Sequence, residues 1–198
     1  NTIFGFPPLT EKAQSTLAKQ NLGWEANLEV SVGDQRDRST HFGVHPNAKL
    51  AYDKYDFHEP PVIGEYVSAY FKHSEAGNLN QDIQNDGEVF YSWPLAIQTN
   101  QAGIAEVVIP NINEIPYEHS VKLFDPVTQV VHDMRQNSSF KFASQGTENP
   151  HYFELMIGKD EFINDELEKI GVVPNKFELA QNIPNPFNPV TNILVSLK

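Results

Sequence analysis

The sequence predicts an all-β fold, an antiparallel β-sandwich of the Ig-like or jelly-roll kind, with a short acidic linker helix near the C-terminus. Short segments in which polar and apolar residues alternate follow one another through the middle of the chain. Turn formers such as Pro110, Asn111 and Pro126 separate these segments, and no amphipathic helix lies between them. Hydrophobic residues make up 39% of the 198 residues, which is enough apolar surface for a buried core.

The predicted strands start with residues 27–32, where polar and apolar side chains alternate. Further strands are predicted at 62–72, 89–99, 104–109, 120–124, 129–133, 139–143 and 152–157. Pro94 lies inside one of them and has no backbone N–H. We therefore predict an edge strand or a bulge at that position.

The helix is predicted over residues 160–170. Phe162, Ile163, Leu167 and Ile170 recur at helical spacing, and Gly171 follows as a stop signal. A short helix of this kind is stable only when its apolar side is covered, so we expect it to lie on the sandwich.

These patterns divide the chain into a lead-in segment (1–21), a β-sandwich module (22–109), residues 110–158, a linker (159–176) and a C-terminal segment (177–198). The lead-in is either a short helix capped by Thr10 or an extended segment. Residues 110–158 form either a small Ig-like unit or a continuation of the same sandwich. No basic stretch followed by an apolar one opens the sequence, so we expect that any signal peptide has been removed or lies far upstream. The sequence also stops inside a predicted strand, and we therefore expect a fragment or a processed form.

The charge balance excludes several partners. The chain has 26 acidic and 14 basic residues, a net charge of −12, whereas phosphate recognition needs clustered Lys and Arg. We therefore expect no nucleic-acid partner. No segment approaches the roughly 18 apolar residues of a membrane span, so we expect no membrane insertion. The absence of cysteine removes disulfides and thiolate nucleophiles.

The C-terminal segment carries the most specific motif. Three prolines, at 184, 186 and 189, hold the backbone extended, and a strand is predicted after them. The segment resembles the opening of the Ig-like C-terminal sorting domain of bacterial type IX secretion system cargo, with Ile183 and Val195 as departures from the family pattern. The matching residues are Leu179, Gln181, Asn182, Pro184, Asn185, Pro186, Phe187, Asn188, Pro189, Thr191 and Ile193.

This resemblance implies a location outside the cell or on the outer cell surface of a bacterium, with the secretion machinery as a partner of the C-terminal segment. The upstream residues 42–61, which include Gly43, Ala48 and the Tyr52–Asp53 pair, are similar to a β-sandwich module that often precedes such sorting domains. Residues 108–142 are similar to the small Ig-like unit that follows that module. The implied partners are neighbouring domains or subunits of the same protein.

No catalytic motif is found in the sequence. It contains no G-x-S-x-G, H-E-x-x-H, phosphate-binding loop or dinucleotide-binding loop. We therefore predict no catalytic residues and no enzyme activity. A hydrolase of unrecognised type would need two convergent carboxylates in a cleft, one of them with a perturbed pKa.

Two clusters are candidate metal sites. His41, His45 and His58 are possible zinc ligands, but Gly43 argues against the helix that their spacing would need. Carboxylates suit calcium better, and they are found at Asp53, Asp56 and Glu59. The alternative is that the aspartates cap turns by accepting backbone hydrogen bonds. No other cofactor is expected.

Aromatic side chains suggest a possible glycan site. Sugar rings stack on exposed aromatic faces, so Tyr52, Tyr55 and Trp93 are candidate ligand-binding residues. Aromatic residues within strands are more often buried in the core, and this alternative applies to Trp93 and Trp24.

The leading functional hypothesis is a non-catalytic extracellular β-sandwich region of a secreted or cell-surface bacterial protein. It would serve as a structural, assembly or filament module and carry the start of a sorting domain. The alternative is a carbohydrate-binding module of a secreted multidomain protein, and a second alternative is an unrecognised hydrolase.

Overall fold

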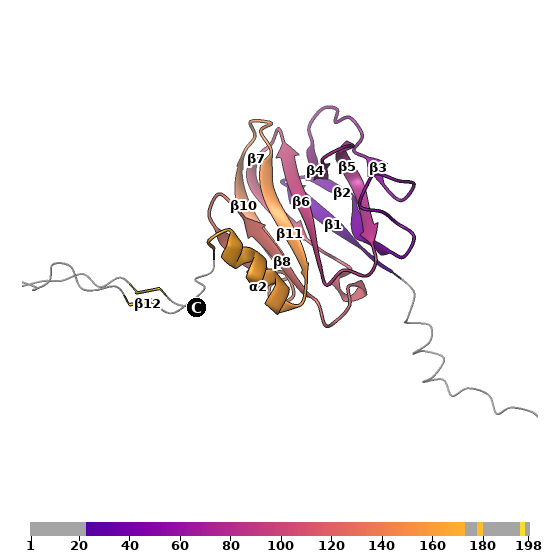
Figure 1. Cartoon of the computed structure of the whole chain (residues 1–198). Helices are drawn as coiled ribbons and strands as arrows, with labels where there is room; N and C mark the ends of the chain where they lie inside the picture. The colour runs from indigo at the N-terminus through magenta and orange to yellow at the C-terminus, as the bar shows by residue number, and fades with distance from the viewer. Residues whose placement is uncertain (1–22, 173–177, 180–194, 197–198) are drawn as a thin grey trace, which may run out of the picture.

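A computed structural model describes residues 23–172, 178–179 and 195–196, and it confirms the all-β fold class (Figure 1). One α-helix, α2 (Asp160–Lys169), and a short 3-10 helix, η1 (Ile112–Glu114), accompany the strands of this part of the chain. The strands of the main sheet are β1 (Trp24–Val32), β2 (Gln35–His45), β3 (Phe57–His58), β4 (Val67–His73), β5 (Gly77–Asn85), β6 (Phe90–Thr99), β7 (Ala102–Val108), β8 (Ser120–Asp125), β9 (Val130–Asp133), β10 (Ser139–Gln145) and β11 (His151–Gly158).

The strands form one folded sheet in the order β10-β7-β1-β2-β5-β4-β6-β11-β8-β9, with β3 added to β5. The sheet curls back on itself, because Phe140 of β10 lies 5.5 Å from Phe153 of β11 between ring centroids. Almost every pairing is antiparallel, as predicted. The exception is β2 with β5, which run parallel from His41 opposite Gln81 to His45 opposite Asn85.

Strands β2, β3 and β5 were not predicted. β5 reads GNLNQDIQN, and Asn, Gln and Asp are depleted in strands, so its sequence resembles a loop. Residues 62–66 were predicted as part of a strand, but β4 begins only at Val67, and Ile63 is 90% exposed.

An edge or a bulge was predicted at Pro94, and the structure pairs β6 on one side only at this position, although the strand as a whole is not an edge strand. β6 is a central strand between β4 and β11, and Pro94 lies in register with Glu154 of β11. The pairing of β6 with β4 ends at Leu95, one residue after the proline in the chain. The missing N–H of Pro94 is therefore tolerated beside the end of a ladder.

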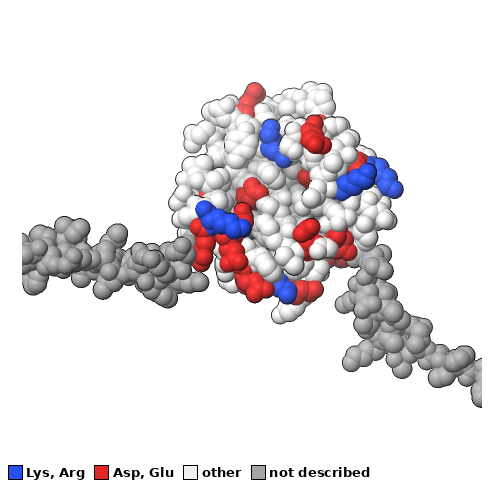
Figure 2. Space-filling view, viewed as in Figure 1, with Lys and Arg blue, Asp and Glu red and all other residues white. Residues whose placement is uncertain are grey.

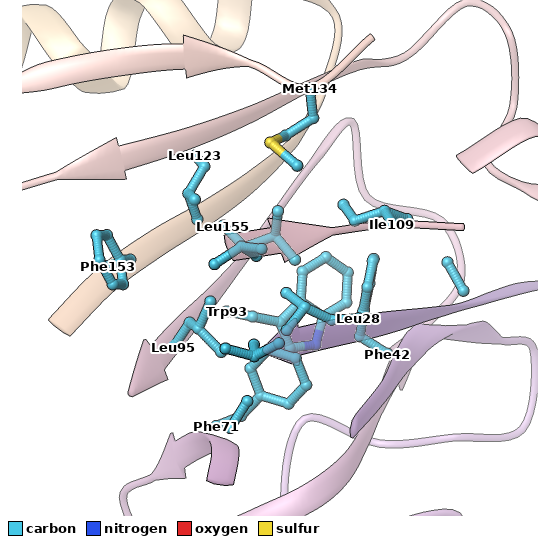
Figure 3. Packing of buried hydrophobic residues seen from close by; sticks show 14 of the residues in the cluster. Leu28, Phe42, Phe71, Trp93, Leu95, Ile109, Leu123, Met134, Phe153 and Leu155 are labelled. Atoms are coloured by element: carbon cyan, nitrogen blue, oxygen red, sulfur yellow. The ribbon is translucent and has the colours of Figure 1, made fainter. Parts of the chain in front are cut away.

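The core lies between the two layers of the folded sheet. Figure 3 shows Leu28, Phe42, Trp93 and Leu155 converging from different strands. Alternate residues of β1 point into this core, as the period of a strand requires. The ring centroid of Trp93 lies 5.4 Å from that of Phe42 and 6.0 Å from that of Trp24, so aromatic contacts hold the centre together.

Residues 22–109 and 110–158 contribute to the same sheet. β10 pairs with β7 over seven residue pairs, and β11 pairs with β6 over eight. Leu123, Phe153 and Leu155 pack in one cluster with Leu28 and Trp93. The strands on both sides of Pro110 therefore share one hydrophobic core.

A polar contact joins β2 to β4 where the sheet turns its corner. The register of β1 with β2 shifts between Leu28 and Val30, where β2 has one extra residue, and Asp37 beside this bulge reaches β4. The Ala69 N–H donates to Asp37 Oδ2 at 2.7 Å, and Thr40 Oγ1 donates to the Ala69 carbonyl at 2.6 Å. These buried side chains satisfy backbone groups that no neighbouring strand pairs there.

Candidate functional site

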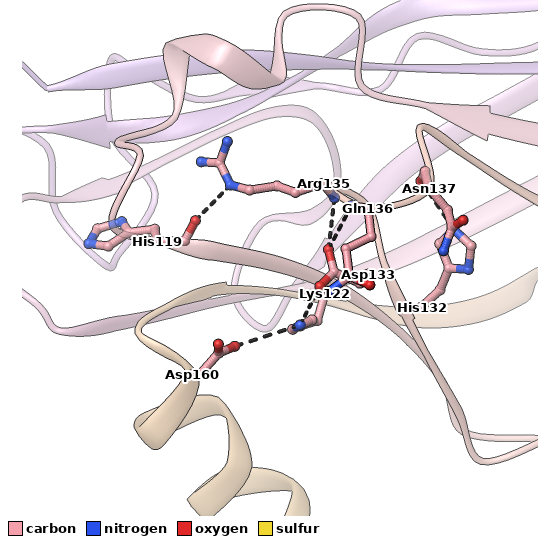
Figure 4. Close-up of polar contacts among 8 residues, drawn as sticks. All are labelled: His119, Lys122, His132, Asp133, Arg135, Gln136, Asn137 and Asp160. Carbon is pink, nitrogen blue, oxygen red and sulfur yellow. Dashed lines mark hydrogen bonds and ion pairs between the residues drawn. The ribbon is translucent and has the colours of Figure 1, made fainter.

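The predicted helix is confirmed as α2, and it covers part of the outer face of the sheet. Ile163 and Leu167 are buried against Phe124 of β8 and Met156 of β11. Lys122 of β8 lies 3.6 Å from Asp160 at the start of the helix. Its Nζ also lies 2.6 Å from Asp133 Oδ2 of β9 (Figure 4). Apolar burial and the Lys122–Asp160 ion pair therefore attach the helix to the sheet.

A groove lies beside α2 on this outer face and is the candidate site. Its cavity has a volume of about 390 Å³, within the range of small-molecule pockets. Trp93 and Leu155 point inward to the core, so their neighbours along the strands point outward to the groove. These neighbours are Phe90, Ser92 and Pro94 on β6 and Tyr152, Glu154 and Met156 on β11.

Two carboxylates line the groove. Glu154 accepts a hydrogen bond from the Ser92 hydroxyl, and Glu166 reaches in from α2. Burial raises the pKa of Glu154, the Ser92 hydrogen bond opposes this shift, and the nearby Glu166 adds to it. Glu166 Oε2 itself pairs with Lys169 Nζ at 2.7 Å. Figure 2 shows acidic side chains gathered over α2 on this face.

The predicted calcium residues Asp53 and Asp56 cap turns. Asp53 accepts hydrogen bonds from the backbone N–H groups of Lys49 and Tyr55. Asp56 accepts them from Asp53, at 2.8 Å, and from Ile83, at 3.0 Å. This is the alternative that the sequence raised. The described residues contain no group of three or more metal-binding side chains, and calcium binding stays a prediction.

Glu59, the other predicted calcium ligand, lies against β4. Its Oε1 accepts a hydrogen bond from Ser68 Oγ at 2.7 Å, and its Oε2 is buried with no hydrogen-bond partner among the described residues. Burial raises the pKa of Glu59 to about 7, and the negative charge of Asp37 contributes to the increase.

The histidines considered as zinc ligands have separate neighbours. His41 Nδ1 lies 3.2 Å from Glu25 Oε1. The rings of His45 and Tyr55 lie 4.4 Å apart between centroids. The structure therefore places these two histidines in different contacts.

The aromatic candidates separate into surface and core residues. Tyr52 is 43% exposed, and its ring stacks on that of His58 at 4.9 Å. Tyr55 is partly buried beside His45, with Lys54 Nζ 4.8 Å from its ring centroid. Trp93 is fully buried, and its indole N–H donates to the Asp82 carbonyl. The prediction that Trp93 contacts a ligand was wrong, because strand alternation directs it inward.

Most of the sorting motif lies outside the described residues. The exception is Leu179, which belongs to β12 (Glu178–Leu179) and pairs with Val195 of β13 (Val195–Ser196). The motif residues outside the described part are Gln181, Asn182, Pro184, Asn185, Pro186, Phe187, Asn188, Pro189, Thr191 and Ile193. The lead-in 1–21 also lies outside it.

The sequence analysis did not identify the groove. One signal was present, because Glu154 is a single acid within the otherwise apolar run of β11. A charge at an apolar strand position marks either an outward face or a buried polar contact. Only the docking of α2 beside that face creates a groove there.

No helix within the described ranges is long and apolar enough to cross a membrane. Comparisons with protein-family models, with curated proteins and with solved structures find no match for this chain.

Proposed function

We propose that this chain is a non-catalytic extracellular β-sandwich region of a secreted or cell-surface bacterial protein. In this role the sandwich is a structural or assembly module that holds the start of a sorting segment for the secretion machinery. The observation that supports the proposal is the firm attachment of α2 to the sandwich, a few residues before the segment that resembles a sorting domain.

The attachment fixes the helix along its length. Lys122 holds the first turn through Asp160, while Leu167 is buried near the other end. The helix ends at Lys169, and Gly171, two residues later, has a φ of +79° that suits the left-handed position after a helix C-terminus. The Val172 N–H then donates to the Leu167 carbonyl at 3.0 Å. The chain therefore leaves the sandwich from a defined position.

We call the fixed attachment of the sorting segment to the sandwich through α2 the mounting role. A secretion experiment tests it. Leu167→Asp places a charge in the apolar contact and should release α2 from the sheet. We expect the full-length cargo carrying this change to accumulate less at the surface of a bacterium with type IX machinery. Glu161→Gln changes an exposed residue of the same helix and should leave secretion unchanged. Normal secretion of the Leu167→Asp cargo, with proteolysis showing a released helix, would contradict the mounting role.

The assembly role has a separate test. Sedimentation velocity and negative-stain electron microscopy of the purified chain, over a range of concentrations, should show concentration-dependent polymers if the sandwich is an assembly subunit. A monomer at every concentration would reject assembly and leave the mounting role in place.

A second candidate function is carbohydrate binding at the loop that carries Tyr52. The exposed ring of Tyr52 and the neighbouring Phe57, which is 56% exposed, favour it because they offer apolar faces beside polar groups. Calorimetric titration with soluble oligosaccharides should give binding that Tyr52→Ala removes. Tyr117→Ala, at another exposed tyrosine, is the matched control. Equal binding by both variants would exclude this site.

A further inference from the structure

The side chains on the floor of the groove beside α2 have the spacing of alternate side chains in an extended peptide. Ser92 lies in register with Met156, and Pro94 with Glu154, so the groove floor follows two neighbouring strands. From Phe90 to Pro94 the floor extends about 13 Å, at roughly 3.3 Å per residue. Outward side chains occur at every second position along both strands, which matches the spacing of alternate side chains in an extended ligand.

The charge of the groove is uncompensated at its centre. Glu154 lies midway along the β11 side, with Tyr152 and Met156 two positions before and after it. No Lys, Arg or His from the described residues lines the groove. Lys169 pairs with Glu166, and Lys122 pairs with Asp133 and Asp160. A half-buried carboxylate without a cation is unfavourable, so the groove would gain from a ligand that supplies one.

The hydrogen-bonding groups favour a cation over a sugar. The side chains that line the groove are mostly apolar, and Ser92 already donates its hydroxyl proton to Glu154. A sugar ring needs donors as well as acceptors for its hydroxyl groups. A guanidinium group needs acceptors only, can bind a carboxylate through two parallel hydrogen bonds, and stacks on aromatic rings such as that of Tyr152.

We propose that this groove is a docking site for an extended peptide segment of a partner protein, which places an arginine beside Glu154 and apolar side chains two positions before and after it. The apolar side chains pack toward Tyr152 at one end and toward Phe90, which lies partly buried against the cluster that contains Met156, at the other. Docking here does not depend on the mounting role, because the groove faces solvent beside the helix and leaves the buried contacts of α2 intact.

Fluorescence anisotropy tests the docking site with the full chain. The probe is a fluorescein-labelled peptide of sequence Leu-Thr-Arg-Thr-Leu, and its control has citrulline, a neutral isostere, in place of arginine. We expect the arginine peptide to bind saturably and about tenfold more tightly than the citrulline peptide, with an affinity that falls as salt increases. Equal affinities, or no saturable binding of the arginine peptide, would overturn the proposal.

Matched variants locate the binding. Glu154→Gln should lower the affinity for the arginine peptide by about tenfold and leave the affinity for the citrulline peptide unchanged. Glu161→Gln makes the same charge change on the exposed surface of α2 and should have no effect. Thermal unfolding of each variant shows that it is folded. An arginine-peptide affinity that is the same for Glu154→Gln and the original chain would overturn the proposal. Binding or cleavage of an oligosaccharide that depends on Glu154, without binding of the peptide, would also overturn it.

Discussion

Glu59 illustrates how burial sets the properties of single residues near β5. Its pKa is raised to about 7, and burial also raises the pKa of Asp82 to about 6 and that of Asp56. The negative charge of Asp37 also raises the pKa of Glu59, and that of Asp56 also raises the pKa of Asp82. The folded chain therefore holds acids whose ionised form is unfavourable where they lie.

The substitution Glu59→Gln should stabilise the chain at pH 8. A folded pKa above the unfolded value means that the folded state binds the proton more tightly. The stability from Glu59 is therefore fully present below about pH 4.5 and is lost as the pH rises through about 7. Since a glutamine at this position would carry no charge, we expect a gain of about 1 kcal/mol at pH 8, after discounting for solvent screening, and none at pH 4.

Urea unfolding at pH 4, 6 and 8 measures this difference. Glu161→Gln, at an exposed position, should unfold with the pH dependence of the original chain. If the free energy of unfolding of Glu59→Gln changes with pH between 4.5 and 7 as steeply as that of the original chain, Glu59 is ionised without cost in the folded state.

Carboxylates hold the segment between β2 and β4, which includes the short strand β3. Asp53 and Asp56 bind backbone N–H groups, and Glu59 binds Ser68. A carboxylate offers about four acceptor positions, so these hydrogen bonds do not by themselves exhaust its oxygens. The structural role and the predicted calcium role therefore use the same residues.

Millimolar calcium should raise the melting temperature of the chain. Asp53 and Asp56 precede the short strand β3 and Glu59 follows it, and the net charge of −12 produces electrostatic repulsion that a bound cation would reduce. Differential scanning fluorimetry with calcium, with magnesium at the same ionic strength and with chelator measures the effect. The same melting temperature in all three conditions would reject a calcium site.

The connection between β7 and β8 depends on one side chain. Arg135 Nε donates to the His119 carbonyl at 2.7 Å (Figure 4). Its Nη2 donates to the carbonyls of Ile115 and Pro116 at 3.1 and 2.9 Å. The guanidinium group therefore satisfies carbonyls of a segment that has no strand partner of its own. Asp133, at the end of β9, accepts a hydrogen bond from the backbone N–H of Arg135 and so holds Arg135 in the turn after that strand.

Arg135→Lys should destabilise the chain by about 1–3 kcal/mol. An ammonium group keeps the charge but cannot reproduce the planar fork, so carbonyls among His119, Ile115 and Pro116 lose their donor. Chemical denaturation measures the loss. Lys141→Arg, on an exposed side chain of β10, is the control for exchanging the two basic groups and should have little effect. Equal stability of Arg135→Lys and the original chain would show that water replaces the guanidinium group.

At the scale of the whole molecule, the main sheet and its large core cluster draw on residues both before and after Pro110 within the described range 23–172. β11 separates β6 from β8 in the sheet, and Phe153, Leu155 and Ile157 fill the centre of the core. Removing residues after 109 would expose a long edge of β6 and a large apolar surface.

We therefore expect residues 1–109 alone not to fold cooperatively. The amide spectrum of this fragment should show little dispersion, and its circular dichroism should lack a sharp thermal transition. Residues 1–172 should fold with a single transition, because they contain every strand of the main sheet. A dispersed spectrum for the 1–109 fragment would instead support a separate sandwich module upstream of Pro110.

The sequence by itself determined the fold class, most of the strands and α2. Alternation within a strand reports which side chains share a face, and the spacing of Ile163 and Leu167 reports a helix with one apolar side. The turns after β2 could also be predicted, because Asp53 and Asp56 are residues that typically cap turns. These are local properties, fixed by residues a few positions apart.

Only the tertiary structure decided the parallel pairing of β2 with β5 and the groove around Glu154. Alternation does not say which strand will be a neighbour, and the polar sequence of β5 becomes a strand only because β2 and β4 supply its hydrogen bonds. The groove exists because α2 covers one part of an outer sheet face and leaves the next part open. Such features depend on contacts between residues far apart in the chain, and no local pattern encodes them.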